Sequence, residues 1–104
     1  RAVFNLVENA IKYNHPDGSV HIDIKYENGF ALISIKDTGI GIAPENQEKI
    51  FKPFFCVDKS RSRTMGGAGL GLALVAEIAQ LHNGTVYVSE SDSEGSTIIL
   101  KLPL

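Results

Sequence analysis

An Asn-Gly pair between two apolar segments constrains the fold of this chain more than any other feature. Residues 19–26 place apolar side chains at every second position, which is typical of a half-buried strand. Residues 30–36 are again rich in Ile, Leu and Phe. Asn28-Gly29 lies between them and is the strongest short signal for a type I′ turn. The sequence therefore predicts an antiparallel β-hairpin over residues 19–36.

Apolar residues recur at helical spacing in two other segments. Residues 1–13 predict an amphipathic helix, and residues 69–82 predict a second one. Asn83-Gly84 follows the second helix as its expected C-cap. A shorter helix is expected over residues 44–51, with Pro44 in its first turn.

The order of the elements indicates the fold class. Residues 85–90 and 96–102 predict a second hairpin after the second long helix. Residues 52–67 form a polar, basic and irregular segment, and segments of that length inside a domain are usually functional or disordered. Two hairpins favour antiparallel pairs, and the helices would cover one face of the sheet. The sequence thus predicts an α+β two-layer sandwich.

Length and charge narrow the class of protein. The chain has 104 residues, enough for one domain with one core. A net charge of −2 gives no global basic field, so we expect no nucleic-acid partner. The single cysteine excludes an internal disulfide and a cysteine-rich zinc site. No apolar run approaches the ~20 residues of a membrane helix, so we expect a soluble cytosolic domain without direct membrane contact.

The first predicted helix carries oxygen ligands for a metal ion. Asn5 and Asn9 are one turn apart and project from the same face. A carboxamide oxygen suits Mg²⁺, which keeps several waters and takes oxygens from nucleotide phosphates. Lys12 continues this face as a point charge for a phosphate, and Tyr13 follows beside it. The alternative is a solvated polar face without a ligand.

A carboxylate and two glycines follow the strand predicted over residues 30–36. Asp37 could accept a hydrogen bond from an exocyclic amino group at the end of that strand. Gly39 and Gly41 would let the backbone approach a flat ring closely. The alternative is an ordinary glycine-rich turn between a strand and a loop.

Glycines also open the second long helix, at residues 66–72. Free backbone N–H groups and the helix dipole favour an anion such as a phosphate there. The segment is not a P-loop, because Leu72-Ala73 stands where Lys-Ser/Thr would be required. It is not a Rossmann fingerprint either, because no strand precedes it directly. The alternative is a flexible hinge for a lid.

Together these segments resemble the catalytic, ATP-binding domain of two-component sensor histidine kinases, within the gyrase–Hsp90–MutL ATPase superfamily. NLVENAIKY (5–13) resembles the N box, DTGIG (37–41) the G1 box, IFKPFF (50–55) the F box and GAGLGL (67–72) the G2 box. The resemblance implies a Bergerat fold with a mixed, mostly antiparallel sheet covered on one face by helices. Residues 1–104 would be one N-terminally truncated domain, without the helix and strand that usually precede the N box. The opening residues, with no Met and no N-cap, also suggest a piece of a longer protein.

The resemblance implies roles for the matching residues. Asn5, Asn9 and Lys12 would form the catalytic set, with Asn9 as the ligand of Mg²⁺. Asp37 would bond the adenine amino group, and the glycines of the G2 box would let the lid close on the phosphates. Phe51 and Phe54 would anchor the lid, although a role as plain core aromatics is an equal alternative. The residues implied to bind ATP are Asn9, Lys12, Tyr13, Asp37, Gly39, Gly41, Ile42, Phe51, Arg61, Arg63, Gly67, Gly69, Leu70, Gly71 and Leu72.

The implied activity is that of an ATP-dependent protein histidine kinase. Mg–ATP would donate its γ-phosphate to a histidine on a separate dimerisation domain of the same parent, and a response regulator aspartate would receive it next. His15, His21 and His82 all lack the helical context of a phosphoacceptor, so this segment alone would not phosphorylate itself. The parent would be a membrane-anchored bacterial sensor with this domain in the cytosol.

Two positions depart from the family pattern. ATP-hydrolysing relatives and anti-sigma serine kinases usually carry a Glu general base where Asn5 stands, so Asn5 favours transfer to a histidine. Cys56 stands where many sensor kinases carry an arginine that reaches the γ-phosphate, and Arg61 or Arg63 could replace it. Two alternatives stay open: a superfamily ATPase or serine kinase, and a non-catalytic nucleotide-binding interaction module.

Overall fold

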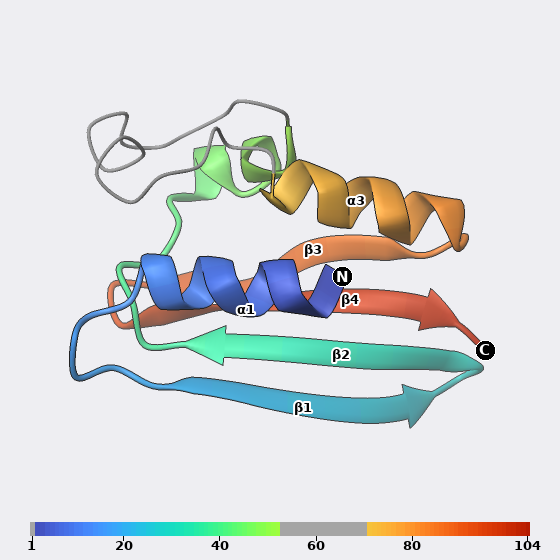
Figure 1. The fold of residues 1–104 in the computed structure, drawn as a ribbon, viewed down its shortest axis with the longest axis horizontal. Coiled ribbons are helices and arrows are strands. Elements are labelled where there is room, and N and C mark those ends of the chain that lie inside the picture. The colour runs from blue at the N-terminus through green and yellow to red at the C-terminus, as the bar shows by residue number, and fades with distance from the viewer. Residues whose placement is uncertain (1, 53–70) are drawn as a thin grey trace.

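A computed structural model describes residues 2–52 and 71–104 of the chain (Figure 1). Two helices, two single turns of 3₁₀ helix and four strands lie in this part. In chain order they are α1 (Ala2–Lys12), β1 (Val20–Glu27), β2 (Phe30–Asp37), η1 (Pro44–Asn46), η2 (Lys49–Phe51), α3 (Gly71–Leu81), β3 (Thr85–Asp92) and β4 (Gly95–Pro103).

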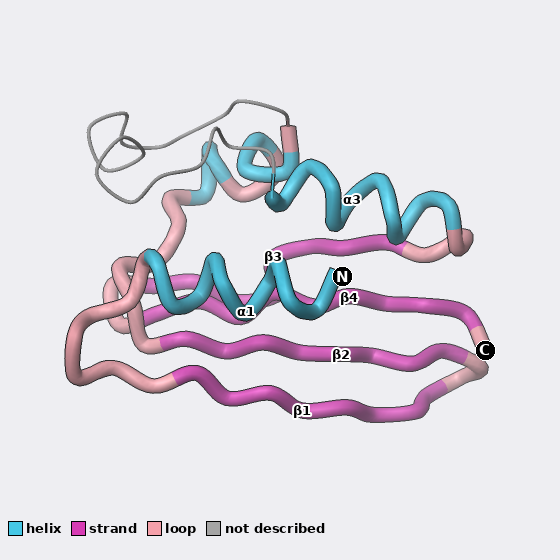
Figure 2. Tube along the Cα trace, in the orientation of Figure 1, coloured by secondary structure: helices cyan, strands magenta, loops and turns pink. Residues whose placement is uncertain are grey.

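The strands form one sheet in the order β1-β2-β4-β3, with α1 and α3 on the same face (Figure 2). The predicted α+β sandwich with helices on one face is confirmed. All three strand pairings are antiparallel, whereas a mixed, mostly antiparallel sheet was expected. The sheet consists of two hairpins, β1-β2 and β3-β4, joined by the antiparallel pairing of β2 with β4.

The Asn-Gly turn has the geometry that the sequence predicts. Asn28 has φ 52° and Gly29 has φ 81°, the two positive values that a type I′ turn requires. Glu27 pairs with Phe30 across this turn, so the register of β1 and β2 follows from the two-residue loop. The second predicted hairpin, β3 and β4, is also confirmed.

The core lies between the helices and the central strands. Its largest fully buried side chains are Leu6, Ile35, Val75 and Leu100, contributed by α1, β2, α3 and β4. The C-terminus of α3 is capped as predicted: Asn83 takes the left-handed conformation at φ 62°. The next N–H, that of residue 84, donates to the residue 79 carbonyl at 2.7 Å, as in a Schellman motif.

Two expectations about single elements are wrong. Residues 44–51 form two separate 3₁₀ turns instead of one short helix, because only Ile50 among them is buried and so short a helix is marginal without packing. β1 is almost wholly exposed rather than half-buried, since α1 packs over the centre of the sheet. Its apolar side chains Ile22, Ile24 and Tyr26 are 47%, 54% and 73% exposed.

Candidate functional site

The two asparagines of α1 retain free polar groups. Asn5 is 8% exposed and Asn9 is half-buried, one turn further along. Within residues 2–52 and 71–104 neither side chain takes part in a hydrogen bond. The Asn9 amide oxygen therefore suits the role predicted for it, since Mg²⁺ needs only one or two protein ligands beside phosphate oxygens and water.

Lys12 and Tyr13 lie at the C-terminal end of the same helix. The Lys12 Nζ is 3.9 Å from Glu8 Oε1, and the two side chains are 31% and 51% exposed, respectively. Such a surface pair contributes only ~0.3–0.5 kcal/mol, so Lys12 can exchange Glu8 for a phosphate at little cost. The Tyr13 carbonyl accepts a hydrogen bond from the Ile40 N–H at 3.3 Å.

Asp37 is the best-defined polar group of the site. It ends β2 and is 8% exposed. Its Oδ1 accepts hydrogen bonds from the Gly39 N–H at 3.0 Å and the Ser96 N–H at 3.2 Å, and its Oδ2 accepts one from the Ser96 hydroxyl at 3.1 Å. A carboxylate accepts about four hydrogen bonds, so this one can accept another from an amino group.

Ser96 is a site residue that the sequence did not reveal. It is buried, and it pairs with Asp37 in the register between β2 and β4. The two residues are 59 positions apart in sequence, and nothing local indicates which strand lies beside β2. Only the tertiary pairing of the two hairpins shows the contact.

The glycines of the 37–41 loop serve the packing of the loop itself. A Cβ on Gly39 would overlap the Tyr13 carbonyl oxygen, and a Cβ on Gly41 would overlap that of Asp92. Gly41 also has φ +77°, in the left-handed region. Close approach of backbone to backbone therefore explains both glycines, and their predicted contact with a ring stays a prediction.

The end of α1 and the Asp37 loop come together in space. Figure 1 shows the C-terminal end of α1 above the C-terminal end of β2. The structure thus places the predicted metal and phosphate residues, Asn9 and Lys12, on the same side of the fold as Asp37.

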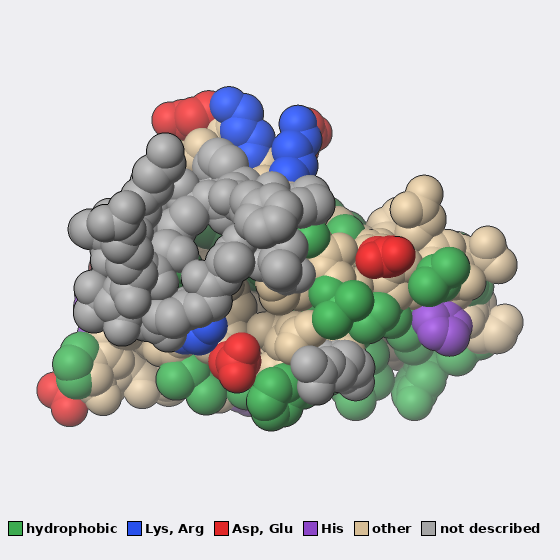
Figure 3. All heavy atoms as spheres, turned by 45° about the horizontal axis from the view of Figure 1, so that its top comes forward, with side chains coloured by type: hydrophobic (Ala, Val, Ile, Leu, Met, Phe, Trp, Pro, Cys, Tyr) green, Lys and Arg blue, Asp and Glu red, His purple; other side chains and the backbone are tan. Residues whose placement is uncertain are grey.

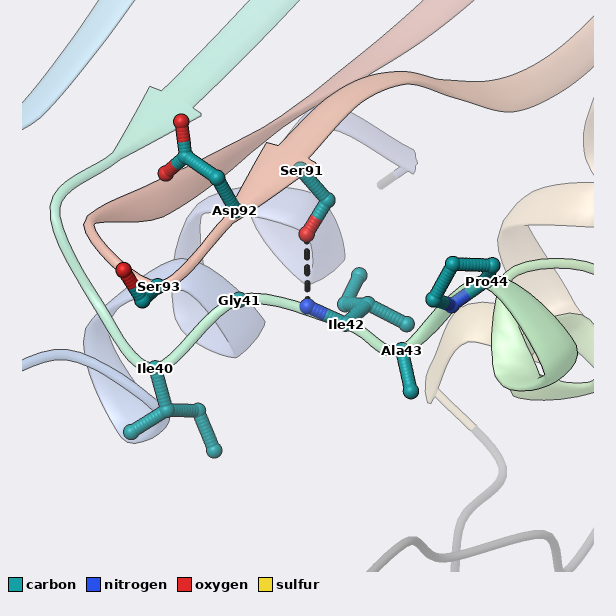
Figure 4. Close-up of a pocket in the computed structure, with 8 residues that line it drawn as sticks. All are labelled: Ile40, Gly41, Ile42, Ala43, Pro44, Ser91, Asp92 and Ser93. Carbon is teal, nitrogen blue, oxygen red and sulfur yellow. Dashed lines mark hydrogen bonds between the residues drawn. The ribbon is translucent and has the colours of Figure 1, made fainter.

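A shallow pocket of about 290 Å³ lies behind the same loop, against the turn between β3 and β4 (Figure 4). The Ser91 hydroxyl closes it on one side by accepting a hydrogen bond from the Ile42 N–H. Gly41 and Ile42 line this pocket, but Asn9 and Asp37 do not. This pocket therefore contains neither the predicted ligand of Mg²⁺ nor the predicted partner of the adenine amino group.

The remaining predicted residues fall into three groups. Phe51 and Leu72 are half-buried and pack against the core, which supports the plain core alternative for Phe51. Gly71 is exposed at the start of α3, where a Cβ would meet open space. Other predicted residues lie outside the described part of the chain: Phe54, Arg61, Arg63, Gly67, Gly69 and Leu70, as does Cys56.

The described surface near η1 and η2 carries charges of both signs. Figure 3 shows lysine and acidic side chains next to one another there. Glu45, Glu48, Lys49 and Lys52 are the exposed charged residues of this stretch. No helix in the described residues is long and apolar enough to cross a membrane.

Comparison with known proteins places this site in a family. The family described as histidine kinase-, DNA gyrase B- and HSP90-like ATPase matches residues 1–104. The sensor-like histidine kinase SenX3 of Mycobacterium tuberculosis is 47% identical over 102 residues, which are 98% of this chain and 25% of SenX3. The chain thus spans about a quarter of the length of this relative.

Solved structures of sensor kinases share the fold. The mycobacterial sensor histidine kinase MprB has a TM-score of 0.82 at 33% identity, covering 98% of this chain and 67% of that one. Full-length ShkA in complex with AMPPNP has a TM-score of 0.83 at 30% identity, covering 98% and 20%. Histidine kinase ThkA in complex with the response regulator TrrA has a TM-score of 0.77 at 27% identity, covering 98% and 27%.

The family match spans the whole chain, and the relatives and solved structures that resemble it are sensor histidine kinases. The chain belongs to the histidine kinase-, DNA gyrase B- and HSP90-like ATPase family, and within it to the ATP-binding domains of sensor histidine kinases.

Proposed function

We propose that residues 1–104 form a catalytic domain that binds Mg–ATP and donates the γ-phosphate to a histidine on the dimerisation domain of the same parent protein. A response regulator aspartate would then receive the phosphoryl group. The observation that carries the proposal is the Asp37 carboxylate, buried and fixed by three hydrogen bonds at the end of β2. It lies on the same side of the fold as the half-buried Lys12 and the Asn9 amide, which makes no hydrogen bond within the described residues.

Each group has a distinct task in this proposal. Asp37 accepts a hydrogen bond from the adenine amino group and so selects the base. Asn9 offers its amide oxygen to Mg²⁺, and the bound ion supplies charge neutralisation at the phosphates. Lys12 adds a positive charge beside them. Positioning and charge stabilisation are the main terms in phosphoryl transfer, so no covalent step by the chain is needed.

Asn5 supports phosphotransfer over hydrolysis. It precedes Asn9 by one turn of α1, and an amide cannot take a proton from water as a carboxylate does. Glu8 is exposed and paired with Lys12, so it is poorly placed as a substitute base. The histidine acceptor would instead bring its own base partner.

The comparisons support the proposed ligand and partners. The similar ShkA structure is described as a complex with AMPPNP, and the ThkA structure as a complex with a response regulator. The phosphoacceptor domain and the membrane anchor would belong to the rest of the parent, with this domain in the cytosol. His15, His21 and His82 are exposed in turn, strand and helix-end positions, and none lies in the helical context expected of a phosphoacceptor.

Calorimetric titration with AMPPNP and Mg²⁺ tests the adenine role. Asp37→Asn should raise the Kd by about 10- to 150-fold, because it replaces a charge-assisted hydrogen bond worth ~1.5–3 kcal/mol. Asp23→Asn, at an exposed position of β1, is the matched control and should leave the Kd unchanged. Equal affinities in the wild type and a folded Asp37→Asn variant would remove Asp37 from the site.

Phosphotransfer is tested with the intact parent kinase. Its histidine should acquire phosphate from ATP, and Asn9→Ala should abolish this labelling. Strong labelling in the Asn9→Ala variant would contradict the Mg²⁺ assignment. Steady ATP hydrolysis by the 104-residue chain, lost in Asn9→Ala, would instead favour a superfamily ATPase.

A further inference from the structure

A network of polar groups joins the end of α1 to the Asp37 loop. The Thr38 hydroxyl accepts a hydrogen bond from the Ser19 N–H at 2.8 Å and donates one to Asn14 Oδ1 at 3.0 Å. The Asn14 Nδ2 in turn donates to the Ser19 carbonyl at 2.8 Å. Each member thus contacts both others, and we call Asn14, Ser19 and Thr38 the polar triad.

Backbone hydrogen bonds run beside the triad and share its partners. The Thr38 N–H donates to the Ser19 carbonyl at 3.2 Å, and the Ile40 N–H donates to the Tyr13 carbonyl at 3.3 Å. A Cβ on Gly18 would overlap Asn14 Oδ1, so the triad also leaves no room for a side chain there. The loop after α1 and the loop after β2 therefore form one hydrogen-bonded unit.

The triad lies between the two halves of the proposed site. Toward the N-terminus, Asn14 follows directly after Tyr13 and the last turn of α1, which contains Asn9 and Lys12. On the other side Thr38 follows Asp37, whose carboxylate is fixed independently by Ser96 from β4. An alteration of the triad could thus shift α1 relative to Asp37 while Ser96 still holds the Asp37 carboxylate.

We infer that Thr38 is a positioning residue that sets the spacing between the adenine-binding carboxylate and the Mg–phosphate end of α1. This inference rests on the proposed Mg–ATP site. Thr38 itself touches neither ligand group; its hydroxyl acts because it both accepts and donates a hydrogen bond between the two loops. A ligand that spans both halves needs the spacing, whereas a ligand that uses only the adenine half does not.

The test compares two probes, adenosine and AMPPNP with Mg²⁺, by calorimetry on the 104-residue chain. Thr38→Val keeps the shape and removes the hydroxyl. It should leave the Kd for adenosine within about twofold and raise the Kd for Mg–AMPPNP by about fivefold or more, the scale of one hydrogen bond. Thr38→Ser restores the hydroxyl and should return the Mg–AMPPNP Kd to within about twofold of the wild type.

Other outcomes overturn the inference in recognisable ways. Equal weakening of both probes by Thr38→Val would show that Thr38 only supports the Asp37 loop, and no change in either would show that it has no role. If Thr38→Val does not fold, Asn14→Ala removes the same hydrogen-bond acceptor and should give the same selective loss. Failure of the wild type to bind either probe would overturn the proposed function itself, and the inference with it.

Discussion

At the scale of single residues, the site depends on Asp37 being held in place from β4. The Ser96 hydroxyl supplies one of its three hydrogen bonds and is itself buried. A buried acceptor that loses a donor is costly, because no water replaces it fully. The fold itself therefore sets the orientation of the carboxylate, as the proposed adenine role requires.

Ser96→Ala measures this contribution. We expect the free energy of unfolding to fall by ~1–2 kcal/mol, because a hydrogen bond to a charged, buried group is lost. Urea unfolding gives the value, and Ser93→Ala in the exposed β3–β4 turn is the matched control. A loss no larger than that of Ser93→Ala would mean that Ser96 does not hold the carboxylate.

Gly39 provides a second test at this scale. Gly39→Ala should lower the free energy of unfolding by ~1–3 kcal/mol, because the new Cβ would overlap the Tyr13 carbonyl oxygen. Gly71→Ala is the control: its Cβ would meet open space, so stability should stay unchanged or rise by up to ~1 kcal/mol. Equal effects of the two substitutions, read from thermal unfolding, would contradict the close approach of the two loops.

At the scale of elements, the sequence predicts the features that depend on neighbouring residues and misses those that depend on long-range packing. The Asn28-Gly29 turn and the cap of α3 depend on a few neighbouring residues, so both were predictable. The pairing of β2 with β4, and with it the contact of Ser96 with Asp37, depends on residues far apart in sequence. The exposure of β1 and the break of residues 44–51 into two turns also depend on where α1 and α3 pack.

The exposure of β1 has a testable consequence. β1 is an eight-residue edge strand, and no described strand pairs with its outer edge. Exposed edges of this kind are templates for pairing with another chain. An antiparallel pairing with a second copy, centred on Ile24, would place complementary side chains opposite one another: Asp23 with Lys25, His21 with Glu27 and Ile22 with Tyr26.

We therefore expect the 104-residue chain to self-associate through β1 as its concentration rises. Ile24→Lys should suppress the association, because it places two like charges at the centre of the pairing. Leu81→Lys, at a 76% exposed residue of α3, is the matched control and should leave it unchanged. Analytical ultracentrifugation checks both, and a monomer at every concentration would contradict the expected pairing.

At the scale of the whole molecule, the two layers contribute different parts of the candidate site. Asp37 belongs to the sheet, and Asn9 and Lys12 belong to the helical layer. The sheet fixes Asp37 through β2 and β4. The C-terminal end of α1, the helix that carries Asn9 and Lys12, lies above the end of β2 (Figure 1). Family membership was recognisable from the order of four short motifs, because each motif is local. How the motifs meet was not, because the contacts between the Asp37 loop, α1 and β4 arise only on folding.

We propose above that the C-terminal half of α1 and the Asp37 loop form one Mg–ATP site. Amide chemical shifts of the 104-residue chain, recorded by NMR as Mg²⁺ and AMPPNP are added, would locate the bound ligand. We expect shifts concentrated at residues 9–13, 37–41 and 96, with none at residues 24–29 at the far end of the first hairpin. Shifts confined to residues 91–93, or no shifts in a folded chain, would contradict it.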